Sequence, residues 1–413
     1  MLAATLAFAA CGPMGTGDGG TGGGGATGGG ASGGGVGGGA AGGGGGTGGG
    51  GTGGGATGGG AAGGGAAGGG GVSPTPFPRV ASPLEALPIA ANESTDIEVD
   101  SQGRIHVVSN YQGFDGGLDY SVRERDGGWW SERIVSGEGA QSVGAGVKLE
   151  LDSTERPHVA FTWADLPGNN LRTRLFYGAR DDAGWRTEAL EDAGFQVSLF
   201  FGFELANDVP HVGYRVRNAL LADGGLTNVI RWGSRVGGAW TLESIESLDE
   251  NMAATAVTVT ADGMPHVFYR STDAGMGVVR HAGRTAPDTW ATEDIATGGL
   301  LRGWATHVGN DLVVAGGPIF TRTNGVWAIA GLADANNSVV RALPNGEVWD
   351  FSNGGSTSGR LLRTGRFVNG QYETALDAGV ANVRYQGWSF DPTSGALVGS
   401  IFDGLNVNIV RLP

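Results

Sequence analysis

The chain has 413 residues, 84 of them glycine, and a formal net charge of −15. Phosphate backbones repel so acidic a protein, and we therefore exclude nucleic acid as a partner. Cys11 is the single cysteine, which excludes an internal disulfide, and the glycines are concentrated in one segment near the N-terminus.

The first 11 residues, MLAATLAFAAC, form a short apolar run that ends in small residues and a cysteine. A helix needs about 20 residues to cross a bilayer, so the run predicts a signal peptide instead of a membrane span. The stretch FAAC resembles the lipobox of bacterial lipoproteins, in which the cysteine is lipidated. The resemblance implies a lipid on Cys11 as the membrane anchor. It also implies export to the cell envelope, at the outer membrane or cell surface of a Gram-negative bacterium.

Residues 12–78 follow as a predicted tether. Between Gly12 and Gly71 the chain is almost wholly Gly, Ala, Thr and Ser, so it has little apolar surface to offset its ordering entropy. We expect a disordered coil of about 60 residues with an end-to-end distance of roughly 40 to 45 Å. The prolines of Ser73–Pro78 favour an extended collar before a folded domain at 79–413.

A short phrase of the type Pro-His-Val recurs through the folded domain. Its histidines are His106, His158, His211 and His266. They are separated by 52, 53 and 55 residues, a period that indicates a repeat fold. In the second repeat, turn residues separate strands predicted at 146–152, 157–163, 174–180 and 185–190. No stretch has helical periodicity. The pattern therefore predicts an all-β fold in which four-stranded antiparallel sheets form the blades of a propeller.

Three further repeats without the histidine bring the predicted number of blades to seven. We assign Leu312, Glu347 and Leu397 to the histidine position in these repeats. The last repeat is short by one strand, whereas Leu84–Ile89 precedes the first repeat in the manner of a fourth strand. We therefore predict that this N-terminal strand pairs with the last blade and closes the ring, which removes an open sheet edge.

The repeated histidines and tryptophans are interpreted as structural. Equivalent atoms of neighbouring blades lie about 10 Å apart, whereas zinc ligands lie about 2 Å from one metal, so we expect no metal and no other cofactor. The histidines are expected to bond a backbone carbonyl or an acid such as Asp100 or Asp152. Tryptophans that open fourth strands are expected to pack between blades, namely Trp129, Trp185, Trp240, Trp290 and Trp327.

The sequence contains no recognised catalytic pattern. It has no G-x-S-x-G elbow, H-E-x-x-H motif or Walker loop, and residues 180–185 depart from the spacing of a sialidase Asp box. By fold analogy, a ligand site is placed on the face where second strands end. Aromatic rings beside acids and arginines suit a sugar. The candidate ligand-binding residues are Tyr111, Phe114, Asp115, Trp163, Asp165, Arg215, Arg270, Asp273, Trp349 and Asp350.

The whole chain resembles bacterial lipoproteins that carry a propeller on a glycine-rich tether. The resemblance implies a binding or interaction module at the cell surface, held to the membrane by its lipid alone. We expect a monomer whose ligand is a glycan or a protein. Two alternatives remain open at this stage: a glycan-acting hydrolase or lyase on the same face, and a structural envelope protein or protein-interaction scaffold.

Overall fold

A computed structural model divides the chain into two units, Met1–Gly68 and Gly69–Pro413. The described residues all lie in the second unit, so Cys11 and the predicted tether lie outside them. These residues are 85–87, 94–111, 116–137, 142–165, 172–190, 196–220, 226–248, 254–271, 277–297, 301, 304–315, 318–331, 339–354, 361–368, 371–381, 384–402 and 407–412. Within these ranges, no helix is long and apolar enough to cross a membrane.

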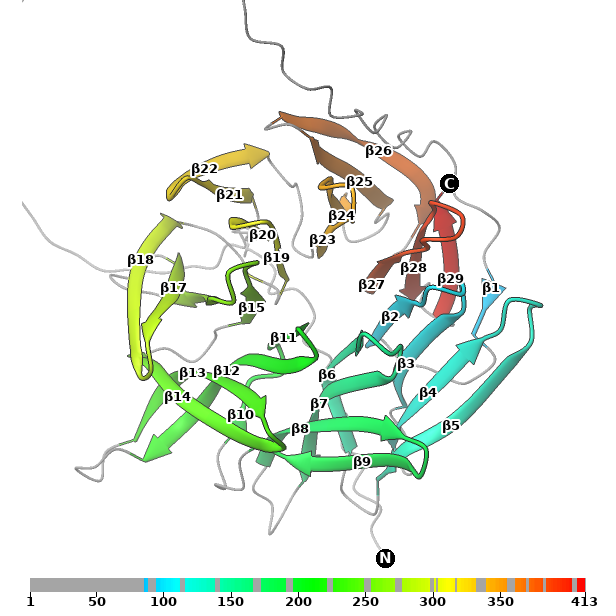
Figure 1. The fold of residues 1–413 in the computed structure, drawn as a ribbon, viewed down its shortest axis with the longest axis horizontal. Helices are drawn as coiled ribbons and strands as arrows, with labels where there is room; N and C mark the ends of the chain where they lie inside the picture. Colours follow the sequence, from blue (N-terminus) through cyan, green and yellow to red (C-terminus); the bar gives the residue numbers. More distant parts are fainter. Residues whose placement is uncertain are drawn as a thin grey trace, which may run out of the picture. The chain divides into compact units, whose positions relative to one another are not determined.

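The second unit is built from antiparallel sheets that form seven blades in a ring, as predicted (Figure 1). Blade 1 contains β2 (Thr95–Val99), β3 (Ile105–Tyr111), β4 (Gly117–Arg123) and β5 (Trp129–Ser136). Blade 2 contains β6 (Ser142–Leu151), β7 (Pro157–Asp165), β8 (Arg172–Asp181) and β9 (Gly184–Ala189). These last four strands match the four that the second repeat predicts.

Blades 3 to 5 follow the same order along the chain. Blade 3 contains β11 (Gly202–Ala206), β12 (Val209–Leu220), β13 (Leu226–Val236) and β14 (Ala239–Leu248), and the short β10 (Gln196–Val197) also pairs with β12. Blade 4 contains β15 (Thr255–Val259), β16 (Pro265–Ser271), β17 (Val278–Ala286) and β18 (Thr289–Thr297). Blade 5 contains β19 (Ala305–Val308), β20 (Asp311–Ala315), β21 (Ile319–Thr323) and β22 (Val326–Gly331).

The last two blades complete the ring, and the N-terminal strand closes it as predicted. Blade 6 contains β23 (Val339–Ala342), β24 (Val348–Gly354), β25 (Leu361–Val368) and β26 (Gln371–Ala381). Blade 7 contains β27 (Arg384–Phe390), β28 (Leu397–Phe402), β29 (Val407–Leu412) and β1 (Glu85–Ala86). Glu85 pairs with Ile409, so the outermost strand of the last blade comes from the start of the domain.

The first strand of each blade is its innermost strand. Contacts join β27 to β2, and then each inner strand to the next through β6, β11, β15, β19 and β23 (Figure 1). Close approach between these strands requires glycine at two places. A Cβ on Gly202 would lie 2.3 Å from the Val257 nitrogen, and one on Gly387 would lie 2.3 Å from Asp96 Oδ1. The inner strands therefore surround the axis of the ring as a continuous wall.

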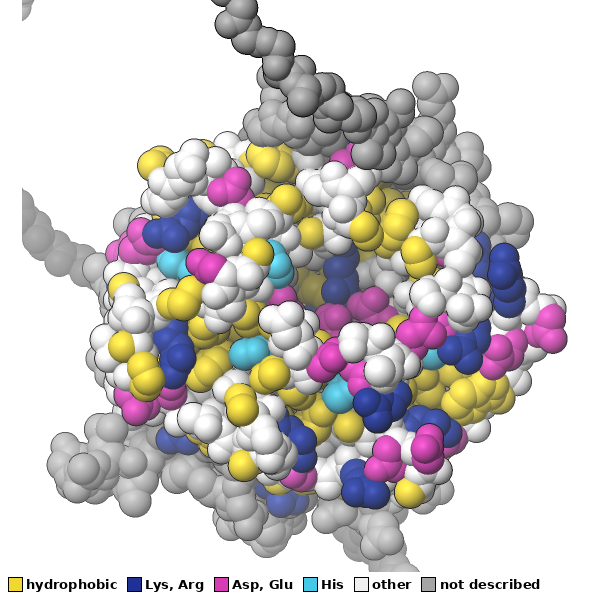
Figure 2. Space-filling model, viewed as in Figure 1, with side chains coloured by type: hydrophobic (Ala, Val, Ile, Leu, Met, Phe, Trp, Pro, Cys, Tyr) yellow, Lys and Arg dark blue, Asp and Glu magenta, His cyan; other side chains and the backbone are white. Residues whose placement is uncertain are grey.

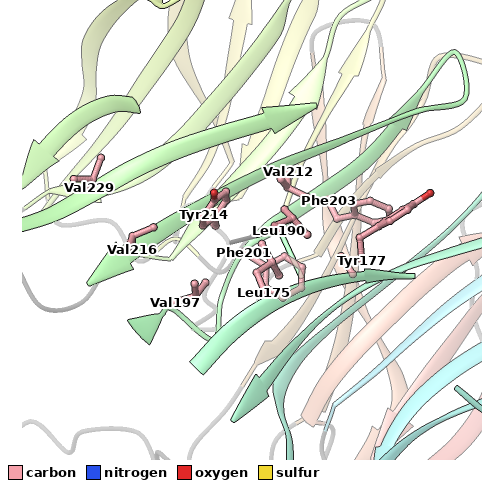
Figure 3. Packing of buried hydrophobic residues seen from close by; sticks show 11 residues of the cluster. Leu175, Tyr177, Leu190, Val197, Phe201, Phe203, Val212, Tyr214, Val216 and Val229 are labelled. Carbon is pink, nitrogen blue, oxygen red and sulfur yellow. The ribbon is translucent and has the colours of Figure 1, made fainter. Parts of the chain in front are cut away.

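The hydrophobic core lies between adjacent blades. Figure 3 shows one such cluster, in which Tyr177 of blade 2 packs near Phe203 and Tyr214 of blade 3. Tyr214 is fully buried and Tyr177 is 3% exposed. Burying a large side chain of this kind contributes about 1.5 to 3 kcal/mol. Alternation of apolar residues along each strand thus supplies the surfaces that hold neighbouring blades together.

The five tryptophans that open fourth strands lie between blades, and each donates its indole N–H to a glutamate of the preceding blade, which at four of the junctions also accepts a bond from an arginine. At the junction of blades 1 and 2, Glu132 Oε1 accepts bonds from Trp185 Nε1 at 2.8 Å and Arg180 Nε at 2.5 Å. We call this arrangement the rim clamp. The clamp acids at the five junctions are Glu85, Glu132, Glu188, Glu243 and Glu293. At the junction of blades 5 and 6, the apolar side chains of Ala330 and Phe367 instead pack against one cluster.

Two of the repeated histidines, His106 and His158, each bond an acid and a tyrosine of their own blade. His158 Nε2 donates to Asp152 Oδ2 at 3.4 Å, and the Tyr177 hydroxyl donates to His158 Nδ1 at 2.5 Å. The expected bond between an acid and the histidine is thus present here, and also between Asp100 and His106 at 3.1 Å. Burial lowers the pKa of both histidines, so both rings are neutral near pH 7.

Backbone pairing corrects two of the positions assigned to the histidine slot. His106 pairs with Glu98 on the inner strand, and Leu312 holds the equivalent position in blade 5 as predicted. In blade 6 the position belongs to Trp349, not Glu347, and in blade 7 to Val398, not Leu397. Without a histidine as a landmark, composition does not set the register of a strand, and only the pairing of the backbones does.

Candidate functional site

Seven polar side chains occupy one register position on the seven innermost strands. We call this set the channel ring. Each member pairs with the residue in the histidine slot of its own blade. In blade order the members are Glu98, Glu150, Glu204, Thr258, His307, Arg341 and Ser389. Every blade therefore contributes one hydrogen-bonding group at the same level of the axis.

Strand periodicity explains how these groups reach the axis. Successive side chains of a strand point to opposite sides. On β2, Ile97 and Val99 pack between blades, and Glu98 lies on the other side of the strand. The side of the strand that carries the ring residues faces the axis, because Arg341 of blade 6 bonds Glu150 of blade 2 across the ring. The inner strands thus combine an apolar packing side with a polar channel side.

Arg341 joins one half of the channel ring. Its Nη2 donates to Glu98 Oε1 at 2.5 Å, its Nη1 donates to Glu150 Oε1 at 3.2 Å, and its Nε donates to the Trp388 carbonyl at 2.7 Å. Ser389 Oγ completes this half by donating to Glu98 Oε2 at 2.7 Å. One guanidinium therefore ties together blades 6, 7, 1 and 2.

The other half of the ring is centred on His307. Thr258 Oγ1 lies 2.9 Å from His307 Nδ1, and the same nitrogen lies 3.7 Å from Glu204 Oε1. The Val259 amide donates to Glu204 Oε2 at 3.2 Å. Glu150 and Glu204 come from neighbouring blades, where the two halves meet, and they act on each other as like charges. The ring is therefore asymmetric, with a cation on one side and a histidine on the other.

The channel position changes the acidity of the ring carboxyl groups. Burial raises the pKa of Glu98 to about 8, which nearby Glu150 and Asp96 favour and Arg341 opposes. Burial likewise raises the pKa of Glu204 to about 8, with Glu150 adding to the shift. Their side chains keep 15% and 20% of their surface exposed, as expected for a narrow channel. Near pH 7 Glu204 therefore carries a proton and can donate as well as accept hydrogen bonds, whereas the two oxygens of Glu98 accept bonds from Arg341 and Ser389.

A second set of charges lies two residues before the ring on the same strands. Asp96 precedes Glu98 on β2, and Lys148 precedes Glu150 on β6. Asp96 is buried and accepts bonds from the amides of Leu149 and Ile97, both at 3.0 Å. A space-filling view down the ring shows a central hollow in which basic and acidic side chains are visible (Figure 2). The axis is thus charged at two successive levels.

Some of the candidates chosen from the sequence lie at the strand ends, as expected. Tyr111 ends β3, Asp165 ends β7, and Arg270 is next to last in β16. Trp163 lies near the end of β7, is 6% exposed and packs beside Phe176. Phe114, Asp115 and Asp273 lie outside the described residues. The role of these residues in ligand binding stays a prediction.

The other three candidates do not lie at strand ends. Arg215 is 2% exposed in the interior of β12, which continues to Leu220. Trp349 and Asp350 are the second and third residues of β24, so they lie near its start, and Trp349 is fully buried. Trp349 belongs to a core cluster with Phe351 and Trp388. Trp349 and Asp350 were misplaced for the same reason as Glu347 in the histidine slot. Only backbone pairing sets the register of blade 6.

The channel ring lies away from the predicted ligand face. It is level with the histidine slot at the start of each second strand, five residues before Tyr111 on β3. At about 3.3 Å per residue this separates the two regions by about 17 Å. A signal for the ring is visible in TDIEV and VKLEL, where charges alternate with large apolar residues. The same alternation occurs on any half-buried strand, so it marks the ring only once these strands are known to be innermost.

The acids of the channel do not form a recognisable metal site. Across the described ranges, no group of three or more His, Cys, Asp or Glu side chains is arranged to hold a metal ion. The ring contains Arg341, whose guanidinium occupies the space between two of its carboxylates. The arrangement is therefore suited to hydrogen bonding with a polar molecule.

The sequence matches no protein-family profile and no curated protein. A protein of unknown function from Dyadobacter fermentans has a similar structure, with 11% identity, a TM-score of 0.49, and coverage of 81% of this chain and 96% of its own. A Trypanosoma rangeli sialidase shares 11% identity with a TM-score of 0.40, over 70% of this chain and 56% of its own. The polysaccharide lyase Uly1 shares 10% identity with a TM-score of 0.42, over 78% and 90%. Identities this low concern the fold alone.

Proposed function

We propose that the protein is a carbohydrate-binding module of the cell envelope and that the channel ring contacts its ligand. The observation that carries this proposal is the asymmetric set of seven polar side chains at one level of the axis. The seven equivalent positions of this repeat fold hold side chains of five different residue types. Packing alone does not call for such variety.

The chemistry of the ring suits a molecule with many hydroxyl groups. A sugar hydroxyl donates one hydrogen bond and accepts others, so its site needs both kinds of partner. Arg341 and Ser389 donate, Glu98 and Glu150 accept, and the protonated carboxyl group of Glu204 does both. If apolar side chains replaced the charged groups at the axis, the fold would be as stable as it is with a buried ion pair, or more stable. The retained charges therefore favour a role in binding.

The location of the protein is part of the same proposal. A lipid on Cys11 would hold the chain in a membrane, and a tether over residues 12–78 would let the propeller reach ligands away from it. This arrangement suits a surface protein that captures glycans. A labelled lipid precursor fed to cells should be incorporated into the wild-type protein but not into a Cys11→Ser variant.

A glycan-cleaving reaction at the same ring is the second candidate. Glu204 has a pKa raised to about 8, so it holds a proton that it could give to a leaving group near neutral pH. Shifts of this kind cluster at catalytic sites. Release of reducing ends from a bound glycan by the wild type, lost in Glu204→Gln, would identify the protein as an enzyme.

A binding screen with the full-length protein tests the main proposal. Glycans and polysaccharides are screened first, and isotherms then compare Glu204→Gln with Glu188→Gln, the same change at an exposed rim clamp. We expect Glu204→Gln to weaken binding about tenfold through loss of a charge-assisted or donor contact, and Glu188→Gln to have no effect. Binding lost in Trp163→Ala but kept in Glu204→Gln would place the site at the strand ends. Absence of any glycan ligand would reject the proposal.

A further inference from the structure

At the junction of blades 4 and 5, a histidine takes over the role that an arginine has in the other four rim clamps. His281 Nδ1 lies 2.9 Å from Glu293 Oε1, and the indole nitrogen of Trp327 donates to the same oxygen at 2.9 Å. Arg322 pairs with Trp327 as the clamp arginines pair with theirs, but its Nε lies 3.4 Å from that oxygen and makes no hydrogen bond within the described residues. The clamp acid is therefore bonded by a ring that can titrate.

His281 is also bonded to a second imidazole. His266 Nδ1 lies 2.8 Å from His281 Nε2, and the ring centroids are 5.1 Å apart. A hydrogen bond between two imidazoles needs a proton on one nitrogen and a lone pair on the other. Because His281 Nδ1 donates to Glu293, its Nε2 keeps the lone pair and His266 donates to it. If both rings were fully protonated, two N–H groups would face each other, so the closed junction excludes that state.

Blade 4 also lacks the acid that supports the histidine of blades 1 and 2. In those blades an aspartate six residues before the histidine bonds its Nε2. Thr260 holds this position in blade 4, and its Oγ1 lies 3.3 Å from His266 Nε2. A hydroxyl oxygen carries no charge that could balance an imidazolium. A proton on His266 is therefore less well tolerated than one on the histidines of blades 1 and 2.

The groups around the histidine pair do not remove this imbalance. Those that face it come from the turn before β16 and from β18, β19 and β21, and they are Asp262, Glu293, His307 and Arg322. Burial lowers the pKa of His266 to about 3 and that of His281 to about 4, and Arg322 adds to both shifts. Between pH 6.5 and these values an opened junction binds protons that the closed one does not. The closed junction therefore loses stability as the pH falls.

Blade 5 is weakly held on its other side as well. Among the described residues no rim clamp joins it to blade 6, because Ala330 holds the position of the clamp acid on β22. Its strands have four, five, five and six residues, whereas β7 and β8 of blade 2 have nine and ten. Val326 and Ile329 on its outer strand are 69% and 62% exposed. Local opening is favoured where few ladder bonds and few buried contacts have to break.

We propose that the junction of blades 4 and 5 is an acid-sensitive seam, at which β21 and β22 separate from β17 and β18 while the other blades stay folded. The bonded imidazoles of His266 and His281 carry this proposal, since the closed seam has a place for one proton between them and none for a second. A second proton breaks the bond between the rings and drives them apart. The seam does not depend on whether the channel ring binds a glycan.

Hydrogen exchange followed by mass spectrometry tests the proposal on the full-length protein. Peptides from β21 and β22 are compared with peptides from β8 and β9 at pH 7 and pH 5, and each rate is divided by the intrinsic rate at that pH. Restoring the pKa of His281 from about 4 to 6.5 on opening favours the open seam by about tenfold or more at pH 5. The protection of β21 and β22 should therefore fall at least about tenfold more than that of β8 and β9. Equal changes in the two blades, or no change, would overturn the proposal.

Two variants connect the response to the histidine pair. His281→Tyr gives blade 4 the tyrosine that bonds the histidine in blades 1 and 2, and it leaves Glu293 to accept a bond from Arg322. It should keep the thermal unfolding midpoint at pH 7 within a few degrees and lose the selective response of blade 5 to acid. Thr260→Asp restores the missing acid and should reduce the same response. If His281→Tyr is unstable, Thr260→Asp decides. A full selective response in a folded variant of either kind would contradict the role of the pair.

Discussion

The rim clamps and the channel ring each occupy one position that recurs from blade to blade. The residue types are kept at the clamp position and vary at the ring position. At the rim, the same three residue types recur from junction to junction, with a glutamate that accepts bonds from a tryptophan and an arginine. At the axis, the equivalent position holds Glu, Thr, His, Arg or Ser in different blades. Repeating the same residues at each junction is expected where similar blades pack against one another in the same way. Variation at one register position creates an asymmetric surface that a repeat alone would not produce.

The rim clamps and the channel ring also differ in how strongly burial affects their charged side chains. Rim clamps lie at the edge of the propeller, where Glu188 keeps 42% of its side chain exposed and water screens its charge. Arg341 and its two carboxylate partners keep only 15% to 21%, so their mutual attraction and their desolvation are both larger. Removing a partner should therefore have a much greater effect at the axis than at an exposed clamp.

The largest effect is expected from Arg341→Ala. The change leaves Glu98 and Glu150 facing each other without a cation, and breaking a buried ion pair in this way costs about 3 kcal/mol of unfolding free energy. Urea denaturation measures the loss. It should be greater at pH 9 than at pH 6, where the carboxyl groups can take up protons. Adding Glu98→Gln should recover part of the stability, and a loss below about 1 kcal/mol would show that the ring is not held by this arginine.

Opposite responses to pH distinguish a repeated histidine from a channel acid. Burial lowers the pKa of His211 to about 4 from 6.5, so between these values the unfolded chain binds more protons and stability falls as the pH falls. Burial raises the pKa of Glu204 to about 8 from 4.5, so there the folded chain binds more protons and stability falls as the pH rises.

Two non-titrating variants measure these responses separately. From pH 7 to pH 5, the wild type should lose about 2 kcal/mol relative to His211→Gln, at 1.36 kcal/mol per unit. From pH 5 to pH 7, it should lose about 2 kcal/mol relative to Glu204→Gln. The unfolding free energy at each pH comes from denaturant titrations. Parallel pH profiles for the wild type and either variant would contradict the corresponding prediction.

The smallest effects are expected within the set of rim clamps, where burial differs between junctions. Glu243 is 3% exposed and accepts two bonds from Arg284 and one from Trp290, so Glu243→Gln should cost about 2 kcal/mol. Glu188 makes the equivalent contacts while exposed, and Glu188→Gln should cost less than about 1 kcal/mol. Equal losses in the two variants would mean that burial does not set the strength of a clamp.

The sequence was a good guide to repeated features and a poor one to unique features. The period of the histidine phrase predicted the blades, and the missing strand predicted the pairing of β1 with β29. It also predicted that Trp185 and its counterparts lie between blades, because a position that repeats reveals its role by recurring. Where repetition fails, as at Trp349 in blade 6, the sequence pattern predicts the residue at the wrong end of its strand.

By itself, the sequence determined the type, number and order of the blades, since alternation and turn signals are local properties that are read a few residues at a time. Only the tertiary structure decided which side chains meet at the axis. Arg341 and Glu150 are 191 positions apart in the chain, and they touch because seven inner strands converge on one line. The same convergence places Lys148 against Trp304 of another blade. Closing the ring is thus the step that turns alternating charges into a candidate site.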